Sequence, residues 1–507
     1  MTSIVLAALA GLLVSFALEG VLQPRPVAPT RRKPSDLALH VGIWLAAYCL
    51  LTLILGRPWF AMTVVSAGLL TLIMVNNAKY LALREPFVFQ DYDYFIDAIR
   101  HPRLYIPFLG WGRAIAAALG IAAAIGLGFW AEDRLQITPQ TLGAYSGMGA
   151  LAAGLILFGH RWRSIMTFEP VTDLTAHGLL SALWHYGHAY FSPVPSWRSP
   201  LLAAEKNPDD SAETLPHIVA VQSESFFDPR TLWPDIAPSV TAGLDRLGAE
   251  AVAAGTCRVP AWGANTVRSE FAFLSGFDAD NLGVHRFNPY RAFKSDEHGS
   301  LARALKNLGY RTLCIHPYPI SFYDRQRVYP LLGFDEFIDL AAFTPADKFG
   351  PYTADQAIAE RIRTLLAEAE VPTFIFVITM ENHGPLHLEK VAPDDIATLY
   401  TAPPPAGTDD LTIYLRHLRN ASRMAEHIAE TLTDNVRPGW LCWYGDHVPI
   451  MSTVYEKLGM PDGRTPYFIW HTDVSEASGP GTHRNASELA QILLKQAGFL
   501  RNAPPSH

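Results

Sequence analysis

The stretch Gly439-Trp-Leu-Cys-Trp-Tyr-Gly-Asp-His447 decides the fold of the C-terminal half of this 507-residue chain. Its first six residues are apolar enough for a buried strand, and an acidic and an imidazole side chain follow at once. Further strands are predicted at His217–Gln222, Arg311–Ile315, Thr373–Thr379 and Tyr467–Trp470. Helical patterns alternate with them at Val267–Leu274, Ser300–Leu308, Ala354–Glu370, Asp410–Thr433 and Ala486–Ala497. This alternation predicts an α/β domain whose mostly parallel sheet packs between helices.

Polar side chains follow four of these strands. Glu224, His316 and His383 each come after one strand, and Asp446 and His447 come together after another. Singly, such a glutamate is more often a helix cap or ion-pair partner, and such a histidine more often a hydrogen-bonded structural residue. Because ligands of parallel sheets bind beyond the carboxyl ends of the strands, we expect the five to share a site. Carboxylate and imidazole together suit zinc or manganese better than calcium or magnesium.

Thr266 is the candidate nucleophile, in Gly263-Ala-Asn-Thr-Val-Arg-Ser-Glu-Phe-Ala-Phe-Leu-Ser-Gly276. A helix is predicted to begin here, and the positive field at a helix N-terminus favours an alkoxide and an incoming phosphate. The structural alternative is that Asn265 or Thr266 only caps the helix. The metal-ligand set downstream favours the catalytic interpretation.

The N-terminal third has a different composition. Only 17% of the whole chain is charged, against about 25% in ordinary soluble proteins, because long apolar runs fill the first 160 residues or so. Five runs are long enough to span a bilayer: Ser3–Leu22, Leu37–Leu55, Trp59–Val75, Ala114–Trp130 and Thr141–Gly159. The first lacks the basic start of a signal peptide. We predict an all-α transmembrane bundle over 1–163, a juxtamembrane helix and linker over 164–216, and a catalytic domain over 217–507.

Bulk charge and cysteine usage exclude other classes. The net charge of −8 leaves no nucleic-acid footprint. The four cysteines form no C-x-x-C pair, so neither a disulfide framework nor a zinc knuckle is predicted.

Five motifs resemble those of one enzyme group. They are Gln222-Ser-Glu-Ser-Phe226, Thr266 with Glu270-Phe271, His316 with Phe322-Tyr-Asp-Arg325, Asn382-His-Gly384 and Tyr444-Gly-Asp-His447. In order and spacing they resemble the sulfatase-like, alkaline-phosphatase-type transferases, above all the lipoteichoic acid synthase and periplasmic-glucan phosphoglycerol transferase family. This resemblance extends over most of the chain, including several of the apolar runs.

The resemblance implies specific roles. Glu224, Thr266, Asp446 and His447 would hold one divalent metal, manganese or zinc, and Thr266 would carry a covalent phospho-intermediate. His316, Arg325 and His383 would bind the phosphate or polarise its leaving group. Tyr323 stands where the family often has a tryptophan, which leaves contacts to the headgroup open. Phosphatidylglycerol would be the donor, and an envelope glycan, glycolipid or polymer the acceptor.

Location is predicted in two conflicting ways. The resemblance implies a multi-pass protein of the bacterial inner membrane with its catalytic domain on the extracytoplasmic, periplasmic side. With five spans, however, the basic clusters fall on the same side as the catalytic domain, which the positive-inside rule would make cytoplasmic.

Several alternative functions stay open at this point. A phosphoethanolamine transferase acting on lipid A or a glycan would share the metal and the threonine, and water in place of the acceptor would give a phosphodiester hydrolase. A sulfatase would need a C-x-P-x-R site, which none of the four cysteines provides. A catalytically inactive envelope binder would keep these residues without using them. A transporter is disfavoured because we expect no charge pairs within the membrane block.

Overall fold

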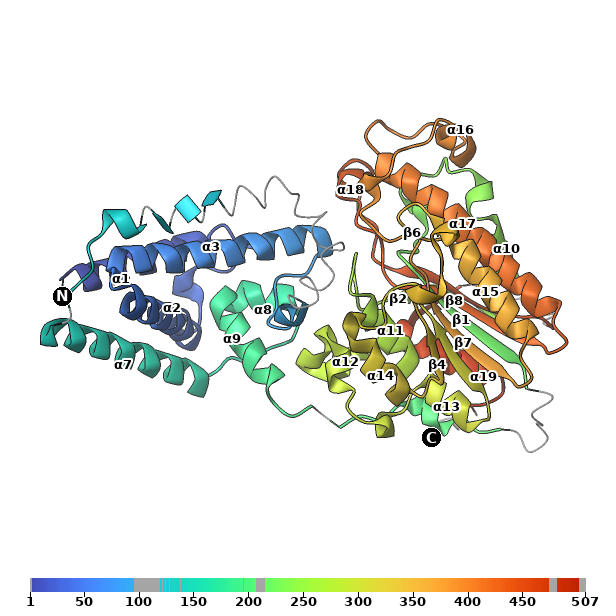
Figure 1. The fold of residues 1–507 in the computed structure, drawn as a ribbon, viewed down its shortest axis with the longest axis horizontal. Coiled ribbons are helices and arrows are strands. Elements are labelled where there is room, and N and C mark those ends of the chain that lie inside the picture. Colours follow the sequence, from blue (N-terminus) through green and yellow to red (C-terminus); the bar gives the residue numbers. More distant parts are fainter. Residues whose placement is uncertain are drawn as a thin grey trace. The chain divides into compact units, whose positions relative to one another are not determined.

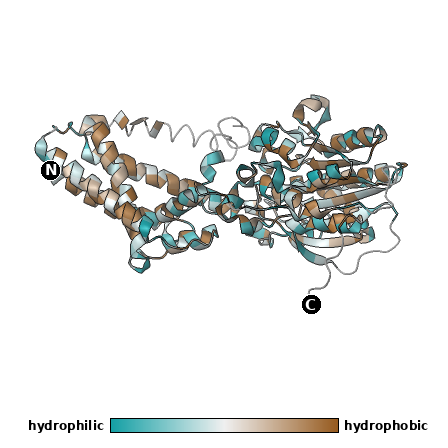
Figure 2. Cartoon of the chain, turned by 90° about the horizontal axis from the view of Figure 1, so that it is seen from below, coloured by the Kyte–Doolittle hydropathy of each residue, from teal (hydrophilic) through white to brown (hydrophobic). Residues whose placement is uncertain are grey.

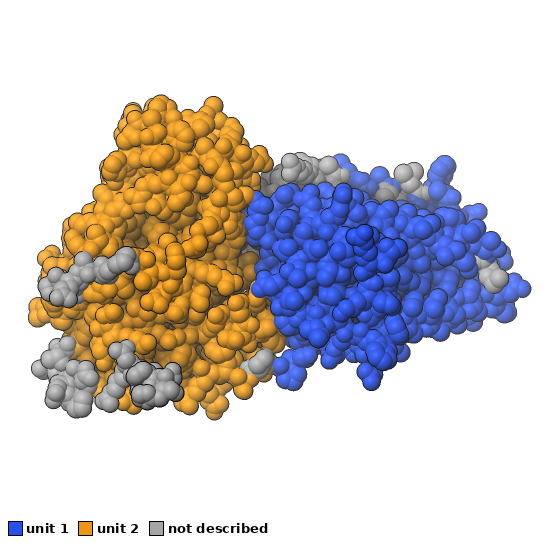
Figure 3. All heavy atoms as spheres, turned by 180° about the vertical axis from the view of Figure 1, so that it is seen from behind, with its two compact units in different colours: residues 1–193 blue, residues 194–507 orange. Residues whose placement is uncertain are grey.

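The structure is a computed structural model, and it describes residues 2–94, 119–206 except 121, 124, 127, 137 and 195, 215–473 and 481–500. The chain divides into two compact units, Met1–Pro193 and Val194–His507, which Figure 3 colours separately. The first unit is helical, and the second contains the large sheet (Figure 1).

Four helices of the first unit are long and apolar enough to cross a membrane, by length and composition. They are α1 (Thr2–Glu19), α2 (Pro34–Leu55), α3 (Pro58–Leu83) and α7 (Pro139–Arg161), and hydrophobic residues dominate them in Figure 2. A proline opens each of the last three, where its missing N–H costs no helical hydrogen bond. These four helices correspond to four of the five predicted apolar runs. The remaining run, Ala114–Trp130, lies partly outside the described residues.

The predicted juxtamembrane helix is two short helices, α8 (Pro170–His177) and α9 (Leu179–Tyr190). They meet at Gly178, whose φ of +79° suits glycine. The buried carboxylate of Asp36 in α2 holds both, because it lies 2.8 Å from His177 Nδ1 in α8 and accepts a 2.8 Å hydrogen bond from Ser181 Oγ in α9. This carboxylate therefore fixes the two short helices against the apolar helices.

A buried ion pair lies at the ends of two apolar helices, where Arg32 Nη1 and Glu19 Oε2 lie 2.6 Å apart. Glu19 ends α1 and Arg32 precedes α2. The pair therefore joins two helix ends and does not line a path along the helices.

The second unit contains an eight-stranded sheet in the order β10-β2-β9-β8-β1-β7-β3-β4. The five predicted strands are confirmed as β1 (His217–Ser223), β3 (Arg311–Ile315), β7 (Thr373–Ile378), β8 (Gly439–Gly445) and β9 (Thr465–His471). Three further strands were not predicted, namely β2 (Ala253–Arg258), β4 (Glu336–Ile338) and β10 (Thr482–Asn485). Only β9 pairs antiparallel to its neighbours in this sheet, so the predicted, mostly parallel sheet is confirmed.

Helices cover both faces of the sheet (Figure 1). One face packs on α10 (Ala242–Glu250), α15 (Asp355–Ala367) and α17 (Asp409–Thr433), and the other on α11 (Thr266–Ser275), α13 (Leu301–Asn307) and α19 (Ala486–Gln496). Alternation along β1 produces the two cores, because Val219 and Val221 face the first set while Ile218 and Ala220 face the second. Since β8, β1, β7 and β3 run parallel, their carboxyl ends meet at one edge.

Candidate active site

Three of the four predicted metal ligands, Glu224, Asp446 and His447, meet at this edge. Glu224 follows β1 and Asp446 follows β8, and the two strands are in register up to Ser223 and Gly445. His447 Nε2 lies 3.6 Å from Glu224 Oε1 and 3.3 Å from Asp446 Oδ2. One ligand atom from each residue lies within 4.8 Å of the others, and all three side chains are buried. Among the described residues, no other three histidine, cysteine or carboxylate side chains could hold a metal in this way.

Neighbouring groups orient these ligands. His447 Nδ1 donates to the carbonyl of Val448 at 3.1 Å, which leaves Nε2 free to face the carboxylates. Ser225 donates its backbone N–H to Asp446 Oδ1 at 2.9 Å and its hydroxyl to Glu224 Oε1 at 2.8 Å. Asp446 Oδ2 is buried and accepts no hydrogen bond from the described part of the chain. Such an oxygen is costly unless a further partner binds it.

Electrostatics indicate that this partner is a cation. Burial, followed by the charge of Asp446, raises the pKa of Glu224 to about 8. Without a further positive charge nearby, ionising both buried carboxylates is costly, so Glu224 keeps its proton at neutral pH. A divalent cation would supply that charge and bind the unpartnered oxygen, so the donor set fits the implied metal.

Thr266 is the first residue of α11. Asn265 occupies the cap position with a left-handed φ of 66°, but its side chain makes no cap hydrogen bond. Within the described chain, the Thr266 hydroxyl also has no hydrogen-bond partner, so neither predicted cap is observed. Ser269 Oγ, one turn further along α11, donates to the carbonyl of Asp446 at 2.6 Å. The helix that carries the candidate nucleophile is thus fixed to the loop that carries a metal ligand.

Burial disfavours the charged form of both His316 and His383. His316 Nδ1 donates to the carbonyl of Ile378 at 3.1 Å, and His383 Nδ1 to the carbonyl of Gly384 at 2.7 Å. Burial, with a contribution from the charge of Arg325, holds the pKa of His316 well below its usual range. Burial also lowers the pKa of His383, against a raising effect of Asp446. With Nδ1 protonated, each ring offers Nε2 as an acceptor.

Arg325 is only 1% exposed and pairs with Glu270. Its Nε and Nη2 donate to the two carboxylate oxygens of Glu270 at 3.1 and 2.7 Å. Nη1 is buried and has no hydrogen-bond partner among the described residues. The Tyr323 ring lies beside it, with its centre 5.2 Å from the guanidinium carbon. One guanidinium N–H group therefore stays available for a ligand.

A second buried cluster was not predicted. His417 of α17 lies 3.0 Å from Glu381 Oε1 through Nδ1 and 2.8 Å from Glu389 Oε1 through Nε2. Burial opposes its charge, but hydrogen bonds to Glu381 and Glu389 raise the pKa of His417 to about 9. Glu381 begins the loop that carries His383. The one sequence signal was a histidine on the apolar face of an amphipathic helix, which needs a buried partner.

Comparisons with known proteins agree with this architecture. The family model "Sulfatase" matches residues 216–499. The chain is 27% identical over 478 residues to "Capsular polysaccharide biosynthesis protein RkpI" of Rhizobium meliloti (strain 1021), covering 88% of this chain and 84% of that protein.

Two solved structures are similar in fold. The integral membrane lipooligosaccharide phosphoethanolamine transferase A (EptA) of Neisseria meningitidis covers 97% of this chain and 95% of its own, with a TM-score of 0.55 and 12% identity. The Streptococcus pyogenes phosphoglycerol transferase GacH, in complex with sn-glycerol-1-phosphate, covers 58% of this chain and 77% of its own, with a TM-score of 0.47 and 22% identity.

Proposed function

Because the chain belongs to the sulfatase family, we propose that it is a membrane-anchored, metal-dependent phosphotransferase that moves phosphoglycerol from phosphatidylglycerol to an envelope glycan. The observation that carries this proposal is the buried group Glu224, Asp446 and His447 with its unpartnered carboxylate oxygen, fixed through Ser269 to the helix that Thr266 begins. The similarity to a capsular polysaccharide biosynthesis protein along most of the chain supports a glycan acceptor.

We assign the ligands of one divalent metal, manganese or zinc, to Glu224, Thr266, Asp446 and His447. When bound, this metal supplies positive charge for the threonine oxygen and the phosphoryl oxygens. Thr266 Oγ forms a bond to phosphorus, and the bond from phosphorus to the diacylglycerol oxygen breaks. The neutral Nε2 of His383 takes the threonine proton and gives it to the departing diacylglycerol oxygen. In the second half of the reaction, the acceptor hydroxyl oxygen forms a bond to phosphorus, the bond from phosphorus to Thr266 Oγ breaks, and the acceptor proton passes to Thr266 Oγ.

The surroundings of His316 support a glycerol headgroup. Its Nε2 accepts a hydrogen bond from a hydroxyl, and the free Nη1 of Arg325 donates to a phosphate oxygen. Because the charge of Arg325 already lowers the pKa of His316, a second cation here is disfavoured. A neutral glycerol hydroxyl fits this place better than an ethanolammonium group.

The four apolar helices support the membrane anchor. We place the protein in the bacterial inner membrane with its catalytic unit on the extracytoplasmic side, where a donor lipid and an envelope glycan meet.

The test is incubation of the full-length protein in detergent with Mn²⁺ and headgroup-labelled phosphatidylglycerol or phosphatidylethanolamine, followed by intact-mass analysis. Wild type and Thr266→Ser should give a phosphoglycerol adduct and diacylglycerol, and Thr266→Ala neither. A phosphoethanolamine adduct would reassign the donor. A folded, metal-loaded protein that forms no adduct and releases no diacylglycerol would refute the proposal.

A further inference from the structure

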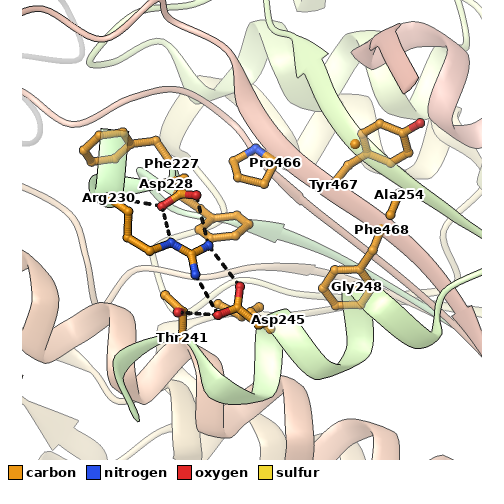
Figure 4. A pocket seen from close by; sticks show the side chains of 13 residues that line it. Phe227, Asp228, Arg230, Thr241, Asp245, Gly248, Ala254, Pro466, Tyr467 and Phe468 are labelled. Atoms are coloured by element: carbon orange, nitrogen blue, oxygen red, sulfur yellow. Dashed lines mark hydrogen bonds and ion pairs between the residues drawn. The ribbon is translucent and has the colours of Figure 1, made fainter. Parts of the chain in front are cut away.

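A separate pocket is lined in part by the residues that follow the candidate metal ligand Glu224 along the chain. It has a volume of about 250 Å³ between α10, the segment after β1, and the strands β2 and β9. In Figure 4, Arg230 lies between Asp228 and Asp245, and Pro466, Phe468 and Gly248 surround the remaining space. The volume is just below the usual range for drug-sized ligands, about 300–1,000 Å³, so a single small ring fits it better than a lipid chain.

Two connections join this pocket to the catalytic edge of the sheet. Phe226 lines the pocket two residues after Glu224, and it packs so closely on Gly445 that a Cβ there would come within 2.2 Å of the Phe226 carbonyl oxygen. Pro466 lines the pocket next to Thr465, whose hydroxyl donates to the Gly445 carbonyl at 2.9 Å. Gly445 immediately precedes the metal ligand Asp446.

The polar side of the pocket is preorganised. Arg230 donates through Nη2 to Asp228 Oδ2 at 2.9 Å and through Nη1 to Asp245 Oδ2 at 2.8 Å. The three side chains are 41%, 35% and 44% exposed, in the order Arg230, Asp228, Asp245. Ion pairs this exposed stabilise a fold little. They do hold two carboxylates in fixed positions, with lone pairs that can accept hydrogen bonds from a ligand.

The balance of charge and apolar surface defines that ligand. Two carboxylates against one guanidinium give the pocket a net negative charge, which disfavours a phosphate headgroup. Leu244, Phe468 and Pro466 supply an apolar side opposite the polar one. A pyranose ring combines an apolar C–H face with hydroxyl donors. We propose that this pocket binds one neutral sugar unit of the acceptor glycan; the inference rests on the proposed transferase function.

Gly248 offers a direct test. A Cβ at this glycine, in α10, meets no atom within 4 Å, so Gly248→Ala should fold normally. Gly248→Phe should fill the pocket without removing a polar contact. Saturation-transfer NMR of the full-length protein in detergent would use methyl β-D-glucoside and methyl β-D-galactoside as neutral probes and sn-glycerol 3-phosphate as the anionic probe.

We expect a neutral sugar to bind wild type and Gly248→Ala, and at least about tenfold more weakly to Gly248→Phe. Asp245→Asn keeps the side-chain shape and should weaken sugar binding several-fold. It is therefore the alternative test variant if Gly248→Phe does not fold. Equal sugar binding by wild type and the folded variants, or no sugar binding by wild type, would overturn the proposal. Glycerol phosphate binding that Gly248→Phe abolishes would reassign the pocket to an anionic headgroup.

The transfer reaction separates this inference from the proposed function. With phosphatidylglycerol and the sugar that binds, the fraction of released headgroup found on the sugar should fall in Gly248→Phe. If wild type releases no diacylglycerol at all, the transferase proposal fails, while the NMR result still decides whether the pocket binds a sugar.

Discussion

Two buried clusters of the catalytic unit use the same side-chain types and differ in charge. Glu224, Asp446 and His447 form one, and Glu381, Glu389 and His417 the other. In the first, the carboxyl pKa of Glu224 is raised by burial to about 8. In the second, hydrogen bonds to two carboxylates overcome burial and raise the imidazole pKa of His417 to about 9.

The difference follows from where the histidine nitrogens point. His417 places both nitrogens on carboxylates, and Glu381 gains further bonds from Asn420 at 2.6 Å and from the Asp355 N–H at 2.7 Å. His447 uses Nδ1 on a backbone carbonyl, and Asp446 Oδ2 has no hydrogen-bond partner in the described chain. We therefore infer that the second cluster, which contains its own cation, is structural, and that the first cluster, which lacks one, binds a metal ion.

The largest expected effect comes from removing a ligand of the first cluster. Asp446→Asn should lose the bound metal and reduce diacylglycerol release by at least about 10³-fold, because Thr266 then lacks the charge that activates it. Metal content by elemental mass spectrometry and lipid release would be measured together. Glu389→Gln, in the second cluster, is the matched control and should keep its metal. Retention of one metal per chain by Asp446→Asn would contradict the assignment.

Removing the internal cation of the second cluster should cost stability instead. His417→Ala leaves Glu381 and Glu389 without their shared counter-charge, and we expect a loss of about 3–5 kcal/mol in the free energy of unfolding. Urea unfolding of metal-free protein would measure it. His447→Ala in metal-free protein should lose much less. Equal losses would show that the two clusters do not differ in the way we infer.

The two clusters should lose their contributions to stability over different pH ranges. When folding raises the pKa of a group, protonation of that group favours the folded state. This contribution to the free energy of unfolding is present at low pH and is lost as the pH rises. For Glu224 in metal-free protein, this loss runs from its ordinary value of 4.5 to about 8, and for His417 from 6.5 to about 9. Metal binding displaces the Glu224 proton, so metal affinity should fall about tenfold per pH unit below pH 8. Chelator competition from pH 6 to about 9 would measure this; an affinity independent of pH would contradict it.

The smallest effect concerns the orientation of a ligand. Ser225→Ala removes one 2.8 Å hydrogen bond to Glu224 and should lower the stability of the metal-loaded protein by about 1 kcal/mol. Asn420→Ala is the corresponding change in the second cluster. Thermal unfolding with and without metal would compare the two. A loss at Ser225 that does not depend on metal would show that its hydroxyl does not act through the metal site.

The sequence predicted the strands that have apolar cores on both faces, and with them the positions of the candidate site residues at their ends. It did not predict β2, β4 or β10, because β10 (Thr-His-Arg-Asn) is mostly exposed, β4 has three residues and β2 is only half-buried. These strands depend on neighbours that pair with them from distant parts of the chain. The partners of Arg325 and His417 were missed for the same reason, since Glu270 and Glu381 lie 55 and 36 residues away.

The left-handed backbone of Asn265 also restricts how this protein can change. Of the residues that a single base change can place there, aspartate and histidine tolerate a positive φ, whereas isoleucine and threonine resist it through their branched Cβ. Substitutions tolerated at residue 265, just before the candidate nucleophile, are therefore confined to a few polar side chains. In related proteins, residue 265 should therefore vary much less than expected for a small side chain that makes no cap hydrogen bond.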